Sequence, residues 1–442
     1  MSLRNRELLN LSGASVLIAL GFVSVFLARQ AALSPASLSY LAIFVGIYFA
    51  AHLVTRIALP NADPFFLPLA ALLTGVGVTM IYRIDPDRAL RQGIWVAVGL
   101  AVFVVVSVFL RDHRQLERLK YTLGVLAVIL LILPAVPGLG RTINGATLWI
   151  DLGPFVFQPG EIAKVLLVVF LASYLRDHRE SLRGDGSARL PSLKHLGPLL
   201  VIWGGAMLVL LVTNDLGSGL LYFSVFVAML YVATGRLLFV TGGAALFVLG
   251  ALAVYRATPH VAERVQIWLS PWQDPSGAGY QLVQSLYAIS SGGLFGSGLG
   301  RGVLVAPDGS TYVPYLETDF IYSALSQELG LVGASAVVLV FLIVVYRGLR
   351  TAMLADDGFT KLLAAGLTAT LGLQACLITG GVTGLIPLTG ITLPFVSYGG
   401  SSIVANFLLL ALLLAVSDRV NRRSFGSCNA AAAWPWQRER TA

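Results

Sequence analysis

Charged residues and cysteines are scarce in this 442-residue chain. Asp, Glu, Lys and Arg make up 12% of it, against about 25% in a typical soluble domain. Two cysteines, Cys376 and Cys428, exclude a disulfide framework, and the five histidines lack the spacing of a zinc site. In contrast, 57% of the residues are hydrophobic and the mean hydropathy is +0.81. The composition excludes an ordinary soluble domain and favours a membrane protein.

Apolar runs long enough to cross about 30 Å of hydrocarbon recur from end to end. A small-residue cleavage site is missing after the first run, so we interpret that run as an anchor and not a signal peptide. We predict an all-α fold, a polytopic membrane helical bundle of about 12 transmembrane helices, with a large extracellular loop between spans 9 and 10. The spans are expected at residues 11–32, 38–59, 64–84, 89–110, 118–137, 162–178, 196–214, 217–235, 237–257, 321–346, 361–384 and 400–418.

The distribution of basic residues predicts the orientation of this bundle. With a cytoplasmic N-terminus, 21 of the 30 Lys and Arg residues fall in cytoplasmic loops or the C-terminal tail, as the positive-inside rule requires. Both termini are therefore predicted to be cytoplasmic. The net charge of +8 reflects this topology and attraction to anionic lipids, so it does not indicate a nucleic-acid partner.

Four polar stretches between the spans all fall on the predicted outer side. They are Asn144–Lys164, Asn214–Gly217, Trp272–Phe320 and Pro387–Ser402. Irregular backbone is tolerated outside hydrocarbon, and binding residues concentrate on loops. The sequence therefore predicts a site at the outer leaflet, formed by several helix ends and the loop 258–320.

Charged residues within these stretches allow two interpretations. Glu161 and Lys164, at i and i+3 of the sixth span, share a helix face and can pair. The pair is either structural or places a cation at a polar cavity. Asp215 is either a cap of the next helix or part of the site. Asp274, between Trp272 and Pro275, has an apolar flank that favours a general base, although Asp-Pro is also a common turn.

Three further patterns belong to the outer stretches. Residues 280–290 predict an amphipathic helix with Gln281, Gln284, Ser285 and Ala288 on one face and Leu282, Leu286 and Ile289 on the other. The glycine-rich run 292–302 lacks a Walker lysine and a βαβ context, so we predict tight turns and no nucleotide site. Residues 385–402 predict either a re-entrant segment with an anion-binding helix start or a capped helix connection.

These residues resemble the SEDS family (shape, elongation, division and sporulation), the RodA and FtsW glycosyltransferases of bacterial wall synthesis. The motifs that carry the resemblance are Asn144-Gly145-Ala146, Gln158-Pro159 with Glu161 and Lys164, Asp215-Leu216-Gly217, Arg264, Asp274-Pro275, Gly279-Tyr280-Gln281 with Gln284-Ser285, Gly292-Gly293, Thr318-Asp319-Phe320 with Glu328-Leu329-Gly330, and Pro394-Phe395 with Ser397-Tyr398-Gly399-Gly400-Ser401-Ser402. The chain departs from the family pattern at Gly160, Asn214, Tyr315 and Ile378, where serine, proline, glutamate and asparagine are usual.

The resemblance also implies a domain organisation. Residues 1–425 form a single membrane domain, with a family core at 64–418 and two additional N-terminal spans at 11–59. A twelve-span form is similar to the actinobacterial RodA-like subgroup. The residues that follow, 426–442, are rich in Ala and Arg and are predicted to be a disordered cytoplasmic tail.

The function that the resemblance implies is peptidoglycan glycosyltransfer in the bacterial cytoplasmic membrane, with lipid II polymerised at the outer face for elongation or division. Asp274 is the expected base, and a class B penicillin-binding protein the expected partner. The expected substrate-binding residues are Glu161, Lys164, Arg264, Gln281, Gln284, Ser285, Thr318, Asp319, Ser397, Tyr398, Gly399, Gly400 and Ser401. No protein metal site is expected, but a divalent cation, Mg²⁺ or Mn²⁺, is left open. The alternatives are a lipid II flippase and a non-catalytic scaffold for the penicillin-binding protein.

Overall fold

The computed structural model describes residues 1–28, 35–110, 112–143, 145–151, 153, 155–183, 193–306 and 309–432. Each predicted span is occupied by a helix. These helices are α1 (Leu3–Ala28), α2 (Pro35–Ala58), α3 (Phe66–Ile84), α4 (Pro86–Phe109), α6 (Lys120–Ile132), α7 (Pro159–Asp177), α9 (Leu193–Val212), α10 (Leu216–Thr234), α11 (Leu237–Ala257), α14 (Ile321–Leu354), α15 (Gly358–Val382) and α16 (Gly400–Ala432). The predicted helical bundle is confirmed.

Among the described residues, nine helices are long and apolar enough to cross a membrane. The other three helices in predicted spans have evident reasons for falling short. α6 and α9 have shorter apolar stretches, Lys120–Ala135 and Gly197–Val212, and α7 carries Glu161, Lys164 and Arg176. The chain is thus a multi-pass membrane protein, and the count of twelve spans remains a prediction.

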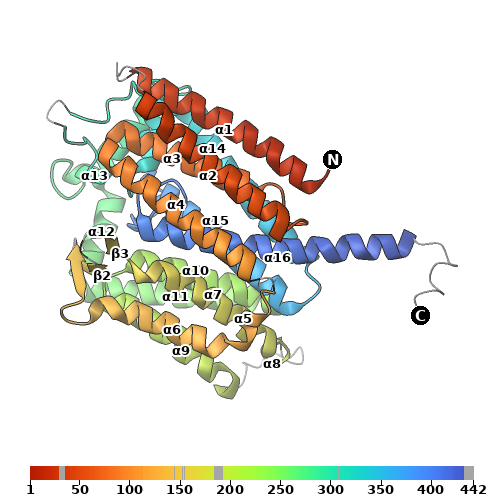
Figure 1. Cartoon of the computed structure of the whole chain (residues 1–442). Helices are drawn as coiled ribbons and strands as arrows, with labels where there is room; N and C mark the ends of the chain where they lie inside the picture. The colour runs from red at the N-terminus through yellow and green to blue at the C-terminus, as the bar shows by residue number, and fades with distance from the viewer. Residues whose placement is uncertain are drawn as a thin grey trace.

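α16 forms the centre of the bundle. It packs against α4, while α14 packs on α15, α6 on α7 and α1 on α3. In its most apolar 18-residue stretch, 83% of the residues are buried, although this stretch is as apolar as those of the exposed helices. Figure 1 shows the N-terminus and the described end of α16 at one end of the bundle, and the strands with α12 and α13 at the other. Two short helices, α5 (Gln115–Arg118) and α8 (Arg179–Arg183), lie toward the end with the termini.

A small β-sheet, which the sequence analysis did not predict, precedes α7. Strands β1 (Gly140–Ile143), β2 (Ala146–Asp151) and β3 (Val156–Phe157) pair antiparallel in that order, with Gly140 opposite Ile150. Gly145 makes the turn between β1 and β2 with a φ of +77°, a conformation that glycine adopts without strain. Asn144, the first residue of the quoted motif, lies outside the described residues. The otherwise helical fold therefore includes a three-stranded antiparallel meander at the end of the bundle opposite the termini.

α14 and α16 show features that the predicted spans did not include. α14 contains a break at Gly330, whose φ of +68° and ψ of −171° are not helical. α16 runs beyond residue 418 to Ala432, and the disordered tail at 426–442 remains a prediction. The alanines at 430–432 favour a helix. Residues 433–442 lie outside the described residues.

The interval 258–320 between α11 and α14 is largely ordered by short elements. It contains α12 (Pro259–Leu269), the 3₁₀ turn η2 (Pro271–Gln273) and α13 (Tyr280–Gly292), followed by glycine-rich turns. Glu328, a fully buried residue of α14, accepts hydrogen bonds from the amides of Gly300 (2.7 Å) and Gly302 (3.2 Å). The Nε of Arg83 lies 3.2 Å from the same carboxylate. The predicted tight turns are confirmed. The backbone amides of Gly300 and Gly302, which a bound phosphate would need as donors, already donate to the buried Glu328 carboxylate.

Candidate functional site

Lys164 lies in α7 and is held by one residue of its own helix and one of α15. Its ammonium donates to Glu161 (2.6 Å) and to the side-chain oxygen of Gln374 on α15 (2.8 Å). The Gln374 amide in turn donates to the carbonyl of Thr392 (2.8 Å). The Lys164 side chain is only 4% exposed. The predicted Glu161–Lys164 pair is confirmed as a contact, and Gln374 joins it to the segment before α16.

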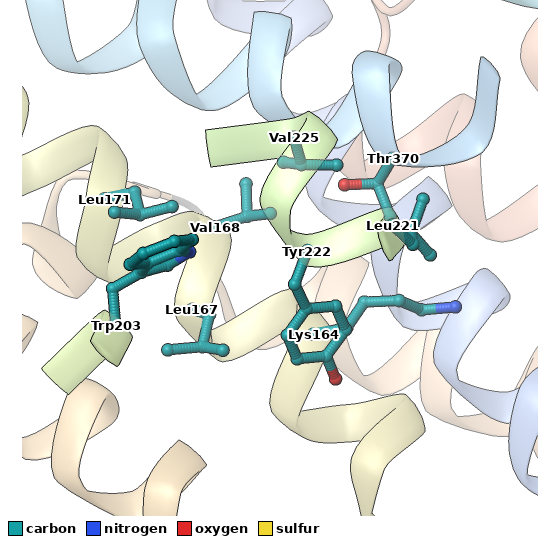
Figure 2. Close-up of a pocket in the computed structure, with 9 residues that line it drawn as sticks. All are labelled: Lys164, Leu167, Val168, Leu171, Trp203, Leu221, Tyr222, Val225 and Thr370. Carbon is teal, nitrogen blue, oxygen red and sulfur yellow. The ribbon is translucent and has the colours of Figure 1, made fainter. Parts of the chain in front are cut away.

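A small pocket lies beside Lys164, between α7, α9, α10 and α15. Figure 2 shows the pocket residues, with the Lys164 ammonium pointing away from Trp203 and Leu171. The space open to the centre of a water molecule is about 10 Å³, room for about one water. Most lining residues are Leu, Val or aromatic. The pocket is therefore no polar passage into the bundle.

Asp215 lies beside this pair and caps α10. Its carboxylate accepts a hydrogen bond from the Ser218 amide (2.9 Å), so the predicted cap is confirmed. Burial raises the pKa of Asp215, the Ser218 hydrogen bonds oppose the shift, and Glu161 adds to it while Arg264 lowers it. The cap is thus within electrostatic range of both Glu161 and Arg264, and the two interpretations of Asp215 are compatible.

Asp319, just before α14, is the next carboxyl in this arrangement. Burial raises its pKa to about 6, and the positive charge of Arg264 on α12 opposes the shift. Carboxyl groups perturbed toward neutral pH are frequent at active sites. Glu161, Lys164, Asp215, Arg264 and Asp319, which we call the charged cluster, therefore come together from the starts of α7 and α10, from α12 and from the loop before α14.

The backbone near the cluster is strained. Three described non-glycine residues have left-handed φ angles: Asn214 (+59°), Tyr315 (+57°) and Phe395 (+64°). Such conformations are uncommon for bulky residues and gather at functional sites. Each of these residues lies in one of the predicted outer stretches. Proline, whose φ is fixed at about −65°, could not adopt this conformation at position 214.

Asp274 is placed differently from the expectation. It is exposed, and so are its neighbours Trp272 and Pro275, so the apolar flank does not enclose it. Its two carboxylate oxygens accept hydrogen bonds from the amides of Gly277 and Ala278, both at 2.9 Å. Its described contacts lie within its own turn, and no described contact joins it to the charged cluster. The turn interpretation is confirmed, and a role as base remains a prediction.

Helix α13 confirms the predicted helix but not its predicted faces. Ser285 is fully buried, 2.7 Å from the hydroxyl of Ser323, and donates to the carbonyl of Val382 (3.0 Å). Ala288 is buried as well, together with Leu282. Gln281 and Gln284 are half-exposed. Ser285 is enclosed by α14 and the end of α15, so its observed contacts are structural, and its role toward a substrate remains a prediction.

The segment before α16 is folded back into the bundle. The Ser397 hydroxyl donates to the Thr318 carbonyl (2.5 Å) and accepts from the Leu393 amide (2.9 Å). Gln92 of α4 bridges the same turn, since it accepts from the Gly399 amide and donates to the Ser397 carbonyl, both at 3.1 Å. The predicted anion site at this helix start is therefore weakened, because Gln92 already uses the Gly399 amide.

The remaining predicted residues of this segment also have structural contacts. The Ser401 hydroxyl accepts a hydrogen bond from the backbone N–H of Gln158 (2.8 Å). The backbone N–H of Tyr398 donates to the backbone carbonyl of Glu317 (2.8 Å). A side chain at Gly400 would collide with Trp95. Thr318 is half-exposed, and its hydroxyl donates to the Tyr315 carbonyl (3.1 Å). These residues shape the wall of the site.

Sequence reasoning missed Gln374, Tyr222 and the ion pair of Arg88 with Glu317. Gln374 pairs with Lys164, and the Tyr222 hydroxyl donates to the Gly160 carbonyl (2.7 Å). Arg88 bonds the buried Glu317 just before Thr318. A glutamine within an apolar run is a usable signal, because a polar side chain inside a membrane needs a partner.

Metal binding finds little support in side-chain clusters. Among the described residues, no group of three or more His, Cys, Asp or Glu side chains is close enough to hold an ion. Mg²⁺ is commonly held by one or two carboxylates together with substrate phosphates. The exposed carboxylate of Asp274 fits one such ligand.

Comparison with known proteins identifies similar chains. The model of the FtsW/RodA/SpoVE family, described as "Cell cycle protein", matches residues 64–422. The peptidoglycan glycosyltransferase RodA of Mycobacterium tuberculosis is 43% identical over 435 residues, covering 95% of this chain and 91% of that protein. The stage V sporulation protein E of Bacillus subtilis is 33% identical, covering 81% and 97%.

Solved structures give the same result for the fold. One, from a study of polymerisation and crosslinking by a peptidoglycan synthase complex, matches with a TM-score of 0.68 at 29% identity and covers 81% of this chain and 98% of that chain. The rod shape determining protein RodA of Thermus thermophilus matches with a TM-score of 0.58 at 26% identity, covering 80% and 96%.

Proposed function

We propose, from the premise that this chain belongs to the FtsW/RodA/SpoVE family, that it is a peptidoglycan glycosyltransferase that polymerises lipid II into β-1,4 glycan strands. The reaction takes place at the outer face of the cytoplasmic membrane, with both termini cytoplasmic. The observation that carries the proposal is the charged cluster, which gathers three carboxylates and two cations at one end of an apolar bundle.

The reaction requires a base and a positive site. The acceptor hydroxyl attacks the anomeric carbon of the donor, its proton passes to a base, and undecaprenyl pyrophosphate leaves with its negative charge. Asp274 is exposed and each of its oxygens keeps a lone pair beyond its backbone hydrogen bond, so it remains the proposed base. A positioned base contributes about 10²–10⁴ in rate.

Lys164 and Arg264 are the proposed partners of the leaving pyrophosphate. Positive groups aimed at the developing charge stabilise such a transition state without reorganisation. Gln374 and Glu161 fix the Lys164 ammonium. The positive charge of Arg264 opposes the rise in the pKa of both Asp215 and Asp319. A divalent ion bound through Asp274 would supply further charge neutralisation for the pyrophosphate.

The flippase alternative would require a polar pathway through the bundle. The pocket inward of Lys164 is lined mainly by apolar side chains and has room for about one water. This observation favours chemistry at the membrane surface. The proposed partner is a class B penicillin-binding protein, in keeping with the similar structure from a peptidoglycan synthase complex.

Purified protein incubated with lipid II tests the proposal. We expect glycan strands on a gel, with more or longer product when a class B penicillin-binding protein is added. A scaffold would yield no polymer in either reaction when the partner carries no polymerase of its own. A flippase would move a labelled lipid II across vesicles without forming polymer, and either of these results would overturn the proposal.

A further inference from the structure

A large cavity lies away from the charged cluster, between α1, α2, α3 and α4. Its volume is about 620 Å³, within the range of about 300–1,000 Å³ for ligand pockets. We call it the N-terminal groove. Phe22 and Phe26 of α1 pack with Tyr82 of α3 along its wall, with ring centroids 5.3 Å (Phe22–Tyr82) and 6.3 Å (Phe26–Tyr82) apart. Figure 1 shows these four helices on one side of the bundle.

The N-terminal groove is formed only partly by the family core. The family match begins at residue 64, so α1 and α2, which provide two of its four walls, precede it. The mycobacterial RodA matches 95% of this chain, whereas the sporulation protein matches 81%. On α4, Gln92 and Trp95 contact the segment before α16, while Leu90, Gly93 and Ile94 line the groove. The groove is a second site, with chemistry of its own.

The lining determines what the groove can hold. It is predominantly apolar, and Ile43, Leu90 and Ile94 at its edges are about half or more exposed, in helices long and apolar enough to face lipid. Water gains little in an apolar cavity, whereas a hydrocarbon chain makes dispersion contacts with several walls at once. The occupant expected from this lining is one acyl chain of a membrane lipid.

The charge at the mouth of the groove indicates which kind of lipid headgroup binds there. Asp87, in the first turn of α4, is the one charged residue among the described lining residues, and exposed Tyr40 lies across from it on α2. Among the described residues, Arg83 pairs with Glu328 and Arg88 with Asp85 and Glu317, whereas Asp87 and the exposed Arg91, one turn further along α4, form no ion pair within 4 Å. A carboxylate without an ion pair attracts an ammonium and repels a purely anionic headgroup.

We propose that the N-terminal groove binds one phospholipid with an ammonium headgroup, such as phosphatidylethanolamine, with an acyl chain among α1–α4 and the ammonium at Asp87. The proposal does not depend on glycosyltransfer. It identifies a lipid site that the additional N-terminal helices create.

Photo-crosslinking in nanodiscs tests it. Phosphatidylethanolamine with a diazirine on its acyl chain should label groove residues of α3 and α4 in the full-length protein, located by peptide mass spectrometry. Gly93→Phe should lower this labelling about ten-fold, because an added side chain enters the groove from a position with no atom within 4 Å. Gly46→Phe is the matched control, because Gly46 is an equally open glycine on α2 that does not line the groove, and it should label like the unmodified protein.

The headgroup is tested separately. Phosphatidylglycerol carrying the same diazirine should label the groove several-fold less than phosphatidylethanolamine, and Asp87→Asn should remove that difference. Excess unlabelled phosphatidylethanolamine should suppress groove labelling in the unmodified protein, while labelling of the exposed face of α11 falls only in proportion to dilution. This competition decides the question even where Gly93→Phe does not fold.

Three results would overturn the proposal. They are equal labelling of Gly93→Phe and Gly46→Phe in folded protein, preferential labelling by a polyprenyl phosphate probe, and groove labelling that excess lipid suppresses no more than labelling of α11. Protection of the groove by a partner's transmembrane helix, with no lipid label in the isolated chain, would likewise assign the groove to a protein partner.

Discussion

At the scale of single residues, Asp274 and Asp319 each have one of the two properties expected of a general base, exposure to the substrate and a raised pKa. Asp274 is exposed, and its carboxylate is oriented by two backbone amides. Asp319 is half-buried beside Arg264, and burial raises its pKa to about 6. Exposure suits contact with a large lipid-linked substrate, whereas a pKa near the working pH suits proton transfer. Substitution of each residue separates the two roles.

Asp274→Asn is expected to abolish polymerisation in a folded protein that still binds its partner. The amide matches the carboxylate in size but cannot accept the proton, so the rate should fall by about 10²–10⁴. Asparagine is favoured in such turns, so thermal stability should change little. Glycan assays on purified protein provide the measurement, and Asp151→Asn, an exposed carboxylate paired with Arg141, is the control. Normal product from Asp274→Asn would move the base to Asp319 or Glu161.

Asp319 should give polymerisation an acid limb near pH 6. Its carboxyl is neutral below about pH 6, so it then neither accepts a proton nor balances Arg264, and the rate should fall as the pH drops through this value. Asp319→Asn should remove the limb. The folded protein holds this proton more tightly than the unfolded chain, whose pKa is about 3.9, so Asp319 contributes less stability as the pH rises from about 4 to 6. A limb unchanged in Asp319→Asn would exclude this assignment.

Lys164→Met is expected to impair both folding and activity. It leaves the Glu161 carboxylate and the Gln374 oxygen without their donor, and breaking a buried pair on one side costs about 3–5 kcal/mol. Glu161→Gln combined with Lys164→Met removes both charges and should recover much of the thermal stability. Polymerisation should remain low in the double variant if Lys164 contacts the pyrophosphate. A stable and fully active Lys164→Met protein would show the pair to be dispensable.

At the scale of elements, the break in α14 and the glycine-rich turns form one unit. Gly330 has a left-handed φ and lies so close to Gly296 that a side chain there would collide with its backbone. The Glu328 carboxylate holds the same turns through Gly300 and Gly302. The motif Glu328-Leu329-Gly330 therefore anchors the turns that follow α13.

Glu328→Gln should loosen these turns. One oxygen becomes an amide that opposes a backbone N–H, and Arg83 loses its charged partner, so we expect a loss of about 3–5 kcal/mol. Hydrogen exchange across residues 293–304 should accelerate and the Tm should fall. Arg301→Ala, at an exposed position of the same turns, should change stability by about 0.5 kcal/mol or less. Equal exchange in the two variants would contradict the anchoring role.

Elements were more predictable than their contacts. Twelve apolar runs indicated twelve helices, and Asp215 indicated its own cap, because periodicity and capping are local properties. The contact of Gln92 with Ser397 and Gly399 joins residues about 300 positions apart, and no local pattern specifies it. Ser285 was assigned to the substrate for the same reason, since only the packed fold shows Ser323 beside it.

At the scale of the whole molecule, the predicted orientation assigns a different role to each end of the bundle. The end with the termini contains ion pairs of Arg347 with Asp63, Arg114 with Asp357 and Arg419 with Asp112. The opposite end contains the charged cluster and the ordered interval 258–320. Basic residues at the first end would be retained in the cytoplasm, and the proposed outer-leaflet chemistry requires the second end to face outward.

Cysteine labelling tests this orientation directly. In a chain with Cys376 and Cys428 replaced by serine, Asp274→Cys should react with a membrane-impermeant maleimide added to intact cells. Asp185→Cys, in a basic loop that lies outside the described residues, should react only after the membrane is opened. The reason is that 21 of the 30 Lys and Arg residues fall on the side of position 185, and translocating each of them is disfavoured.

A tail cysteine restored at position 428 should behave like position 185, because an even number of spans returns the chain to the side where it began. Labelling of positions 274 and 185 from the same side would invalidate the orientation, and the outer-leaflet site with it. Opposite labelling of positions 185 and 428 would instead reject the count of twelve spans while leaving the site where it is.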